Sequence, residues 1–321
     1  MQELVVISGK GGSGKTSLLA SLAMLFQNRA VVVDCDVDAA NLHLVLTPRV
    51  IHSVDFVGGC QARITLDRCS RCGKCAELCR FGAIQYCGDG DSVSYHVDPV
   101  FCEGCGVCAH FCPTGAISLL PTVNGQWFVS QARCGPMVHA RMNPGAENSG
   151  KLVTELRRQA RHLASQHELD LILCDGSPGI GCPVIASMTG ADLALIVVEP
   201  TLSGVHDFRR VAQLARQMGV PSLLVVNKSN VNSRIAGSLE REAAHMGIKS
   251  LGRVPYDLAV TQAQIAGRTV VEFCKGPAAQ AIGHLWRELE QVLQADSAIA
   301  TSERVRAVVE PVSTVTTAHG D

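Results

Sequence analysis

The chain has 321 residues, of which 47% are hydrophobic, and its formal net charge at pH 7 is −1. This length suggests one large domain or two smaller ones, and the near-neutral charge excludes a broad basic surface for nucleic acid. No apolar run reaches the roughly 18 residues of a membrane-spanning helix, and the first residues lack the basic start of a secretory signal. We therefore expect a cytoplasmic protein that binds no nucleic acid and has no direct membrane anchor.

The first predicted element is a buried strand over residues 4–8, which leads through a glycine-rich loop into a helix over residues 17–27. The loop reads Gly9-Lys-Gly-Gly-Ser-Gly-Lys15-Thr16. In this setting the backbone N–H groups can surround phosphate oxygens, Lys15 can neutralise the outer phosphates, and the Thr16 hydroxyl can reach Mg²⁺. The sequence thus predicts a nucleotide site that includes Gly11, Gly12, Ser13, Gly14, Lys15, Thr16 and Ser17.

Acidic residues follow a second predicted strand, over residues 30–33. Asp34, Asp36 and Asp38 stand there in alternation. Acids at the carboxyl end of a strand lie beside the ligand crevice of an open α/β sheet. For Asp34 and Asp38, capping of the following turn is an equally good interpretation.

Residues 69–112 contain one cysteine motif twice. The spacing C-x2-C-x2-C-x3-C begins at Cys69 and again at Cys102, and it is typical of bacterial ferredoxins that carry two clusters. Because the fourth cysteine of each run serves the other cluster in such proteins, two [4Fe-4S] clusters are expected. We expect one to be held by Cys69, Cys72, Cys75 and Cys112, and the other by Cys102, Cys105, Cys108 and Cys79. Two tetrahedral zinc sites are the alternative, since zinc also binds four thiolates.

Later strands and helices alternate along the chain. Residues 169–175 form a predicted strand that ends in Asp175, which we interpret as the acid that holds Mg²⁺ through water. Further strands are expected at 193–198 and 222–226, and helices at 151–165, 205–218, 233–246 and 278–293. This alternation predicts an α/β fold with a mostly parallel, helix-covered sheet.

The cysteine repeat interrupts this pattern, so we expect a discontinuous P-loop ATPase domain with an inserted domain. Residues 1–58 and 123–294 are assigned to the former, and residues 59–122 to a small α+β domain of the bacterial ferredoxin type. Short strands are expected there at 84–86 and 92–97. Residues 124–127 are interpreted as a turn back into the main domain, and residues 295–321 as a partly disordered tail.

One feature of the loop points to a family. A second lysine, Lys10, stands at its front, and the pattern K-G-G-x-G-K-[ST] resembles the deviant Walker A motif of the MinD/ParA, Mrp and nitrogenase iron protein ATPases. Residues 148–153 and 199–207 carry the same resemblance. It implies that Lys10 acts in trans, across a dimer, on the nucleotide of the partner subunit. It also implies that Asp36 is a catalytic residue that positions water, that Asn227 contacts the purine base, and that ATP is the nucleotide.

Two further cysteines are candidates for a third cluster. Cys182 lies seven residues after Asp175, and in the nitrogenase iron protein a cysteine at that offset ligates a cluster shared by two subunits. Cys134 is the candidate for the second ligand of each subunit. For both residues the alternative is an ordinary packing cysteine, which is how we interpret the remaining five.

The predicted function is an ATP-hydrolysing iron–sulfur protein in which nucleotide-driven closure of a dimer is coupled to electron transfer to a redox partner. The dimer is expected to be a homodimer or a heterodimer with a related ATPase. A second hypothesis is an ATPase that assembles or transfers a metal–sulfur cofactor to an accepting protein. A third is a cell-positioning ATPase with a redox-sensing domain.

Overall fold

The computed structural model describes residues 1–88, 94–143 and 149–309, with side chains of the last helix described to residue 295. Its centre is a nine-stranded sheet of order β11-β10-β9-β1-β8-β2-β7-β6-β3. Neighbouring strands from β11 to β7 are parallel, and β6 and β3 are added antiparallel at one edge. The strands are β1 (Gln2–Ser8), β2 (Ala30–Asp34), β3 (Arg49–Ile64), β6 (Ile117–Ala132), β7 (Gly135–Met142), β8 (Leu171–Pro178), β9 (Leu193–Val198), β10 (Ser222–Asn227) and β11 (Lys249–Val254).

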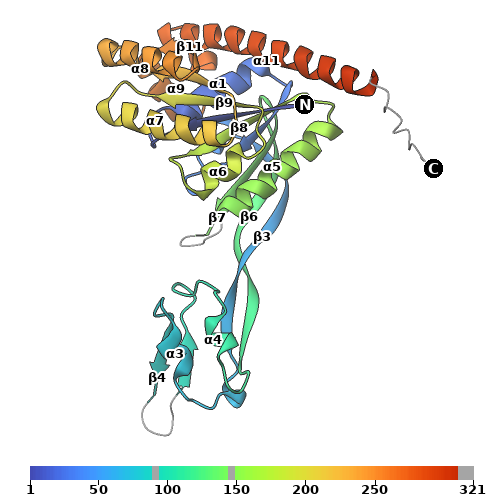
Figure 1. Ribbon diagram of the computed structural model, residues 1–321, viewed down its shortest axis with the longest axis vertical. Coiled ribbons are helices and arrows are strands. Elements are labelled where there is room, and N and C mark those ends of the chain that lie inside the picture. Colours follow the sequence, from blue (N-terminus) through green and yellow to red (C-terminus); the bar gives the residue numbers. More distant parts are fainter. Residues whose placement is uncertain (89–93, 144–148, 310–321) are drawn as a thin grey trace, which may run out of the picture.

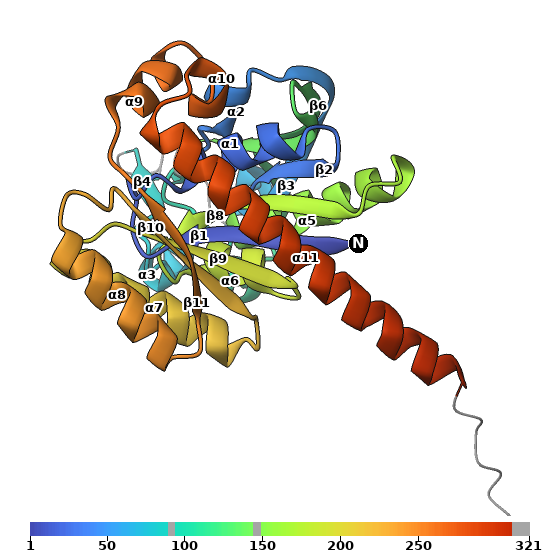
Figure 2. The ribbon, with the colours of Figure 1, turned by 90° about the horizontal axis from the view of Figure 1, so that it is seen from above.

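Helices cover both faces of the sheet because successive residues of a strand point to opposite sides. Val5 and Ile7 belong to the core under α5 (Ser149–Gln166), α6 (Cys182–Met188), α7 (Leu202–Gln217) and α8 (Ser233–His245). Leu4 and Val6 belong to the opposite core, under α1 (Lys15–Phe26), α2 (Leu42–Leu46), α9 (Leu258–Ile265), α10 (Val270–Phe273) and α11 (Pro277–Val309). Figure 2 shows α11 lying diagonally across its face of the sheet.

The predicted strands and helices of the main domain are confirmed, with ends that shift by a few residues. The last helix is the exception, because α11 continues beyond the predicted end at residue 293 and reaches Val309. The final part of the predicted disordered tail, residues 310–321, lies outside the described residues, as do residues 92 and 93 of a predicted short strand.

The two antiparallel strands form a long ribbon that the sequence did not reveal. β3 pairs with β6 from Arg49–Gln131 to Ile64–Ile117, and β6 also forms a hairpin with β7. The prediction of a turn at residues 124–127 is wrong, since all four residues lie within β6. Trp127 is held there by burial in the core. Gly125 is required by a close approach rather than a turn, because a Cβ atom would lie 2.5 Å from the Arg141 carbonyl oxygen.

The ribbon leaves the sheet on the side where the carboxyl ends of the parallel strands lie. β7 is parallel to β2, and β6 is antiparallel to β7, so β3 runs toward the carboxyl ends of the parallel strands. Gly58 and Asn124 are unpaired at the point where the ribbon leaves, which makes two bulges side by side. Bulges bend a strand and increase its twist. The predicted domain boundaries, 58/59 and 122/123, fall at these bulges, within continuous strands.

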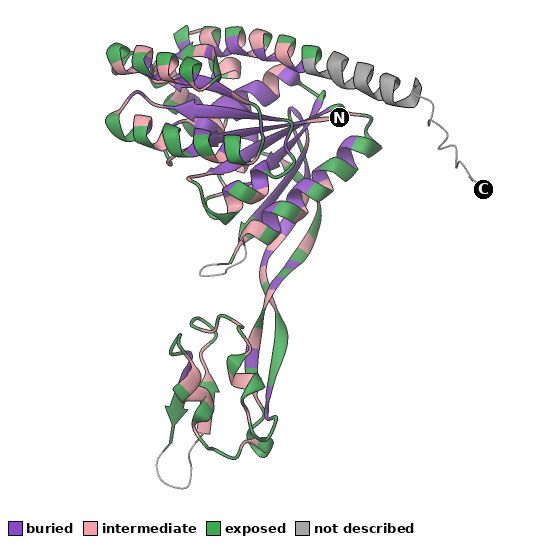
Figure 3. Cartoon of the chain, in the orientation of Figure 1, coloured by how far each residue is buried: buried purple, intermediate pink, exposed green. Residues whose placement is uncertain are grey.

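The cysteine repeat forms a separate lobe at the far end of the ribbon (Figure 1). It contains a 3₁₀ turn (Leu66–Arg68), α3 (Lys74–Leu78), α4 (Val107–His110) and a hairpin of β4 (Ile84–Cys87) and β5 (Ser94–Val97). Figure 3 shows little buried surface in this lobe compared with the main domain. Among its described residues between β3 and β6, the buried hydrophobic ones are Ala83, Ile84 and Ala116. An apolar core this small stabilises a lobe of this size poorly without another source of cohesion.

Candidate functional site

The glycine-rich loop joins the end of β1 to the start of α1, and glycine is required at its last turn. Gly14 caps α1 in the left-handed region at φ +88°, where other residues are strained. A Cβ atom at Gly14 would also lie 2.2 Å from Asn227 Nδ2. Asn227 Nδ2 donates to the Ser13 carbonyl oxygen at 2.7 Å, so the end of β10 is tied to the loop.

Lys15 lies at the centre of an acidic cluster. Its ammonium Nζ is 2.9 Å from Asp175 Oδ1 and 3.4 Å from Asp36 Oδ2, and all three side chains are buried. Burial lowers the pKa of Lys15, but the attraction of Asp175, Asp36 and Asp34 outweighs burial and holds that pKa above its ordinary value. The lysine is therefore charged and can exchange carboxylate partners for phosphate oxygens.

Two buried polar atoms beside Lys15 have no hydrogen-bond partner among the described residues. They are Asp175 Oδ2 and Ser13 Oγ. A buried polar group without a partner is costly, so an ordered water, ion or ligand is expected at such atoms. A hydrated Mg²⁺ beside Asp175 and a phosphate beside the loop fit these two atoms, with the Thr16 hydroxyl at the start of α1 as the second oxygen ligand.

The carboxylates after β2 have different partners. Asp34 is fully buried; Oδ1 accepts from the Asp36 N–H and Oδ2 from the Leu42 N–H, both at 3.2 Å. Burial and the neighbouring Asp175 raise the pKa of Asp34 to about 8. Asp34 thus holds the turn that carries Asp36, whereas Asp36 faces Lys15. No capping bond of Asp38 occurs within the described residues.

Lys10 is held within its own subunit by Glu199. The Lys10 ammonium contacts Glu199 Oε1 and donates to Ser203 Oγ at 3.0 Å. Lys228 Nζ lies 3.1 Å from Glu199 Oε2 and donates to the Gly12 carbonyl oxygen at 2.8 Å. Partial burial raises the pKa of Glu199, but the two lysines outweigh it and hold that pKa below the ordinary value. Glu199 and Lys228 were not predicted as site residues, although residues 199–207 resemble those of the family.

The glycine-rich loop and several of these side chains line one cavity of about 480 Å³, whose lining does not include Asp34, Asp175 or Glu199. Its walls include every predicted loop residue from Gly11 to Ser17, together with Lys10, Asp36 and Asn227. Tyr256 and Gln264 also line it, and Gln264 Nε2 donates to Ser17 Oγ at 2.7 Å. Tyr256 lies in residues 252–257, which resemble the last strand and the nucleotide-flanking loop of the family, whereas Gln264 was not predicted because α9 carries no motif.

The eight cysteines of the repeat lie around two small cavities in the lobe. Gly73 and Gly106, at φ +73° and +79°, begin α3 and α4 in corresponding positions of the two runs. The first cavity is lined by Cys69, Cys72, Cys75 and Cys112. The second is lined by Cys79, Cys102, Cys105 and Cys108. Each cavity therefore contains three cysteines of one run and the fourth of the other.

Backbone and hydroxyl groups around the first cavity favour thiolate at Cys72 and Cys112, whereas burial raises the pKa of Cys75. The Ala116 N–H donates to Cys112 Sγ at 3.3 Å, and the Thr114 hydroxyl lies 3.7 Å from the same sulfur. Hydrogen bonds from the Lys74 backbone and the Ser70 hydroxyl lower the pKa of Cys72. Within the described residues, no three His, Cys, Asp or Glu side chains converge closely enough to hold a single ion.

Cys134 and Cys182 are not brought together. Cys182 is exposed at the start of α6. Cys134 is 1% exposed and packs in the core on the opposite face of the sheet, under α1 and α11. Burial raises the pKa of the Cys134 thiol to about 11. The prediction that Cys134 shares a cluster with Cys182 is therefore corrected, because a core thiol on the other face cannot reach a surface shared with a second subunit.

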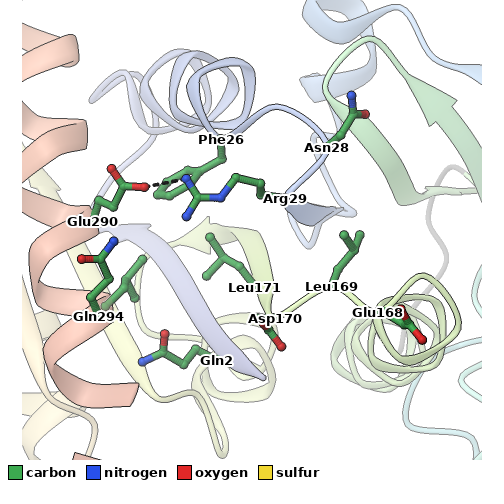
Figure 4. A pocket seen from close by; sticks show the side chains of 11 residues that line it. Gln2, Phe26, Asn28, Arg29, Glu168, Leu169, Asp170, Leu171, Glu290 and Gln294 are labelled. Carbon is green, nitrogen blue, oxygen red and sulfur yellow. Dashed lines mark hydrogen bonds and ion pairs between the residues drawn. The ribbon is translucent and has the colours of Figure 1, made fainter. Parts of the chain in front are cut away.

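Another cavity, of about 390 Å³, lies at the amino ends of the parallel strands (Figure 4). Its walls include Gln2 and Leu171, at the beginnings of β1 and β8, and the ion pair of Arg29 with Glu290 at 2.5 Å. Ligands of open α/β sheets bind at the carboxyl ends of strands. This cavity is therefore separate from the phosphate-binding edge.

Comparisons with known proteins agree with this geometry. Residues 4–270 match the family described as the CobQ/CobB/MinD/ParA nucleotide binding domain. An uncharacterized protein of Methanocaldococcus jannaschii is 32% identical over 91% of this chain and 98% of its own length. An iron-sulfur cluster carrier protein of Pyrococcus furiosus is 26% identical over 45% of this chain and 53% of its own length.

Solved structures of low sequence identity show the same fold. The cell division ATPase MinD of Pyrococcus furiosus superposes with a TM-score of 0.54 at 20% identity, over 91% of this chain and 99% of its own. MinD of Pyrococcus horikoshii, complexed with Mg-ADP, gives a TM-score of 0.55 at 18% identity, over 91% and 97%. In the described part of this chain, no helix has the length and apolar character to cross a bilayer.

Proposed function

The chain belongs to the CobQ/CobB/MinD/ParA family of nucleotide-binding domains, and on that premise we propose that it is an ATP-hydrolysing iron–sulfur protein that transfers electrons to a partner. Nucleotide-driven closure of a dimer controls the transfer. One observation carries the proposal. The nucleotide cavity lies at the carboxyl ends of the parallel strands. The ribbon extends from the same side of the sheet to the eight cysteines that line two cavities.

The residues of the nucleotide cavity have distinct roles in this proposal. Lys15 leaves the carboxylates and neutralises the phosphates, while Thr16 and Asp175 hold Mg²⁺, the latter through water. Asp36 orients the attacking water. Lys10 leaves Glu199 and stabilises the charge that develops on the transferred phosphoryl group of the partner subunit. Asn227 contacts the adenine base, and to do so its amide gives up the hydrogen bond to the Ser13 carbonyl oxygen.

The donor sets in the lobe fit two [4Fe-4S] clusters. Four thiols line each cavity, and thiolates are the usual ligands of such clusters. When bound, the clusters supply one-electron storage. They also supply the cohesion that the small apolar core of the lobe lacks, since metal binding is coupled to folding in small domains.

The base of the ribbon connects the main domain with the cysteine lobe. Asn143 follows β7 directly; its N–H donates to the Asn124 carbonyl oxygen at 2.8 Å, and its Nδ2 donates to the Val123 carbonyl oxygen at 3.0 Å. These bonds fasten the bulged strand to the carboxyl edge of the sheet, beside the turn that carries Asp36. Asn143 and residues 37–40 of that turn line the same cavity, so a movement of the turn on nucleotide binding acts close to the point where the ribbon bends.

A second candidate function is assembly or transfer of a metal–sulfur cofactor. It is favoured by the exposed thiol of Cys182 at the start of α6 and by the partial similarity to an iron-sulfur cluster carrier protein. In that case Cys182 of two subunits would hold a bridging cluster without Cys134. The cell-positioning hypothesis has only the shared fold in its favour, and a fold alone does not assign a function.

Anaerobic purification with iron, sulfide and zinc analysis tests this proposal. About eight irons per chain are expected, because each four-thiolate set binds one four-iron cluster. The ATPase rate should be slow without a partner and should differ between the oxidised and reduced protein. Stoichiometric zinc, or fast hydrolysis by an isolated monomer, would refute the proposal. Iron above that number, found only in dimers and lost in Cys182→Ala, would favour the assembly function.

A further inference from the structure

A larger cavity, of about 710 Å³, lies beside the turn that follows β2. Residues 37–40 of this turn form one wall, and β6 and β7 form the other. Ala39 lines both this cavity and the nucleotide cavity. The two cavities therefore share a wall made by the segment that carries Asp36.

Nitrogen-bearing side chains gather in this larger cavity. His43, His139 and Arg141 all line it. The two imidazole rings are stacked at 6.1 Å between centroids, and Phe128 also stacks on the His139 ring, at 5.0 Å. The opposing charge among the lining residues is the carboxylate of Asp38.

Most of the hydrogen-bonding capacity of these groups is unused. Within the described residues, the side chains of His43 and Arg141 make no hydrogen bond or ion pair, and the His139 ring uses only Nε2, which lies 2.9 Å from Ser130 Oγ. His139 is 8% exposed and Ser130 1% exposed, so this pair is fixed in the wall. Burial and the neighbouring His43 lower the pKa of His139 to about 4, and burial and Arg141 lower that of His43. Near neutral pH both rings are uncharged, and Arg141 supplies the positive charge.

From this arrangement we propose that the cavity binds a small organic anion, a carboxylate or a phosphate ester, and that the bound anion controls the turn carrying Asp36. Guanidinium and imidazole N–H groups are the donors that such anions prefer. Aliphatic and aromatic walls with a few convergent polar groups are typical of small-molecule sites. The volume leaves room for a compact body attached to the anionic group.

The position of the cavity gives the bound anion two routes of action. It contacts the shared wall at Ala39, so it favours one position of the turn over another and alters nucleotide affinity or hydrolysis. It also adjoins Asn143, whose two hydrogen bonds fasten the base of the ribbon. Control of hydrolysis rests on the proposed function of the nucleotide cavity, whereas binding of the anion does not.

Histidine NMR with two separate probes, succinate and inorganic phosphate, tests the site. The C2–H resonances are assigned from the spectra of His43→Gln and His139→Gln. We expect at least one probe to shift both resonances saturably, and the affinity to fall at least tenfold in Arg141→Gln. The matched control is Arg49→Gln, because Arg49 is exposed on β3 and does not line the cavity. Phosphate bound at the glycine-rich loop is distinguished, because it shifts neither resonance in this saturable, Arg141-dependent way.

The same probe should change the ATP hydrolysis rate at least twofold in the wild type and in Arg49→Gln, but not in Arg141→Gln. Resonances that neither probe moves, or that move equally in Arg141→Gln, would overturn the anion site. Binding without any change in hydrolysis would overturn its control of the turn. If the wild type hydrolyses no ATP even without a probe, the proposed function fails, while the NMR result still decides the site.

Discussion

Lys10→Ala is expected to bind ATP with little loss of affinity and to lower ATP hydrolysis by roughly a thousandfold or more, as removal of an arginine finger does. The reason is geometric. Lys15, Asp36 and Asp175 form the phosphate-binding cluster without Lys10, which lies outside it against Glu199 and Ser203. Nucleotide affinity by calorimetry and steady-state hydrolysis of the same preparation are the measurements.

Mixing two inactive variants tests whether Lys10 acts across the dimer. In a heterodimer of Lys10→Ala with Asp36→Asn, one nucleotide site has its own Asp36 and the partner's intact Lys10. An equimolar mixture should therefore regain about a quarter of wild-type activity, because half of the dimers are mixed and each has one complete site. If Lys10 acts within its own subunit, no complete site forms and the mixture stays inactive.

Glu199→Gln changes the residue that Lys10 contacts within its own subunit, and it complements Lys10→Ala. It removes the charge that holds Lys10 and Lys228 while leaving the side chain in place. Lys10 is then released more readily, so dimer formation at a given ATP concentration should increase rather than decrease. A fall in both ATP affinity and dimer formation would show that Glu199 supports the loop itself, through the Lys228 bond to the Gly12 carbonyl oxygen.

The second large effect is expected in the cysteine lobe, where Cys79→Ala should remove about half of the iron, one cluster of two. Cys79 belongs to the first run in sequence but lines the cavity of Cys102, Cys105 and Cys108. A second substitution in the same cavity, Cys79→Ala with Cys102→Ala, should therefore cause no further loss. Iron and sulfide analysis after anaerobic purification measures both variants.

The informative comparison is Cys79→Ala combined with Cys69→Ala. Because Cys69 lines the other cavity, this pair should remove nearly all of the iron. If each run instead holds its own cluster, the two double variants exchange their results. Cys87→Ala is the control, since Cys87 is exposed and lines neither of these cavities. Unchanged ATP affinity in every variant would show that the main domain remains folded.

Local motifs were the part of this protein that its sequence predicted well. The loop from Gly9 to Thr16 and the acids after two buried strands depend on neighbouring residues, so their cavity could be anticipated. The distribution of the eight cysteines between two cavities matches the exchange of the fourth cysteine that is known from two-cluster ferredoxins. Within the loop and within the cysteine repeat, the residues that meet are close in sequence, whereas Asp175 reaches Lys15 because both follow neighbouring parallel strands.

Several contacts between distant residues were not predicted, or were predicted wrongly, because no local pattern in the sequence encodes them. The hydrogen bond of Lys10 with Ser203 joins residues 193 positions apart, and no local pattern encodes it. The ribbon was mistaken for a turn because Asn124 and Gly125 are typical turn residues, whereas the pairing of β6 with β3 and β7 determines their conformation. Cys134 was misassigned because its burial follows from that same hairpin.

The central claim is that nucleotide state controls electron transfer. The most direct test is the rate at which the anaerobically reduced protein reduces a one-electron acceptor dye, measured with and without Mg-ATP, in the wild type and in Lys10→Ala. Our account predicts that Mg-ATP changes the rate in the wild type by about tenfold, equivalent to roughly 1.4 kcal/mol in the barrier, and leaves Lys10→Ala unchanged. Equal rates with and without Mg-ATP in the wild type would contradict it.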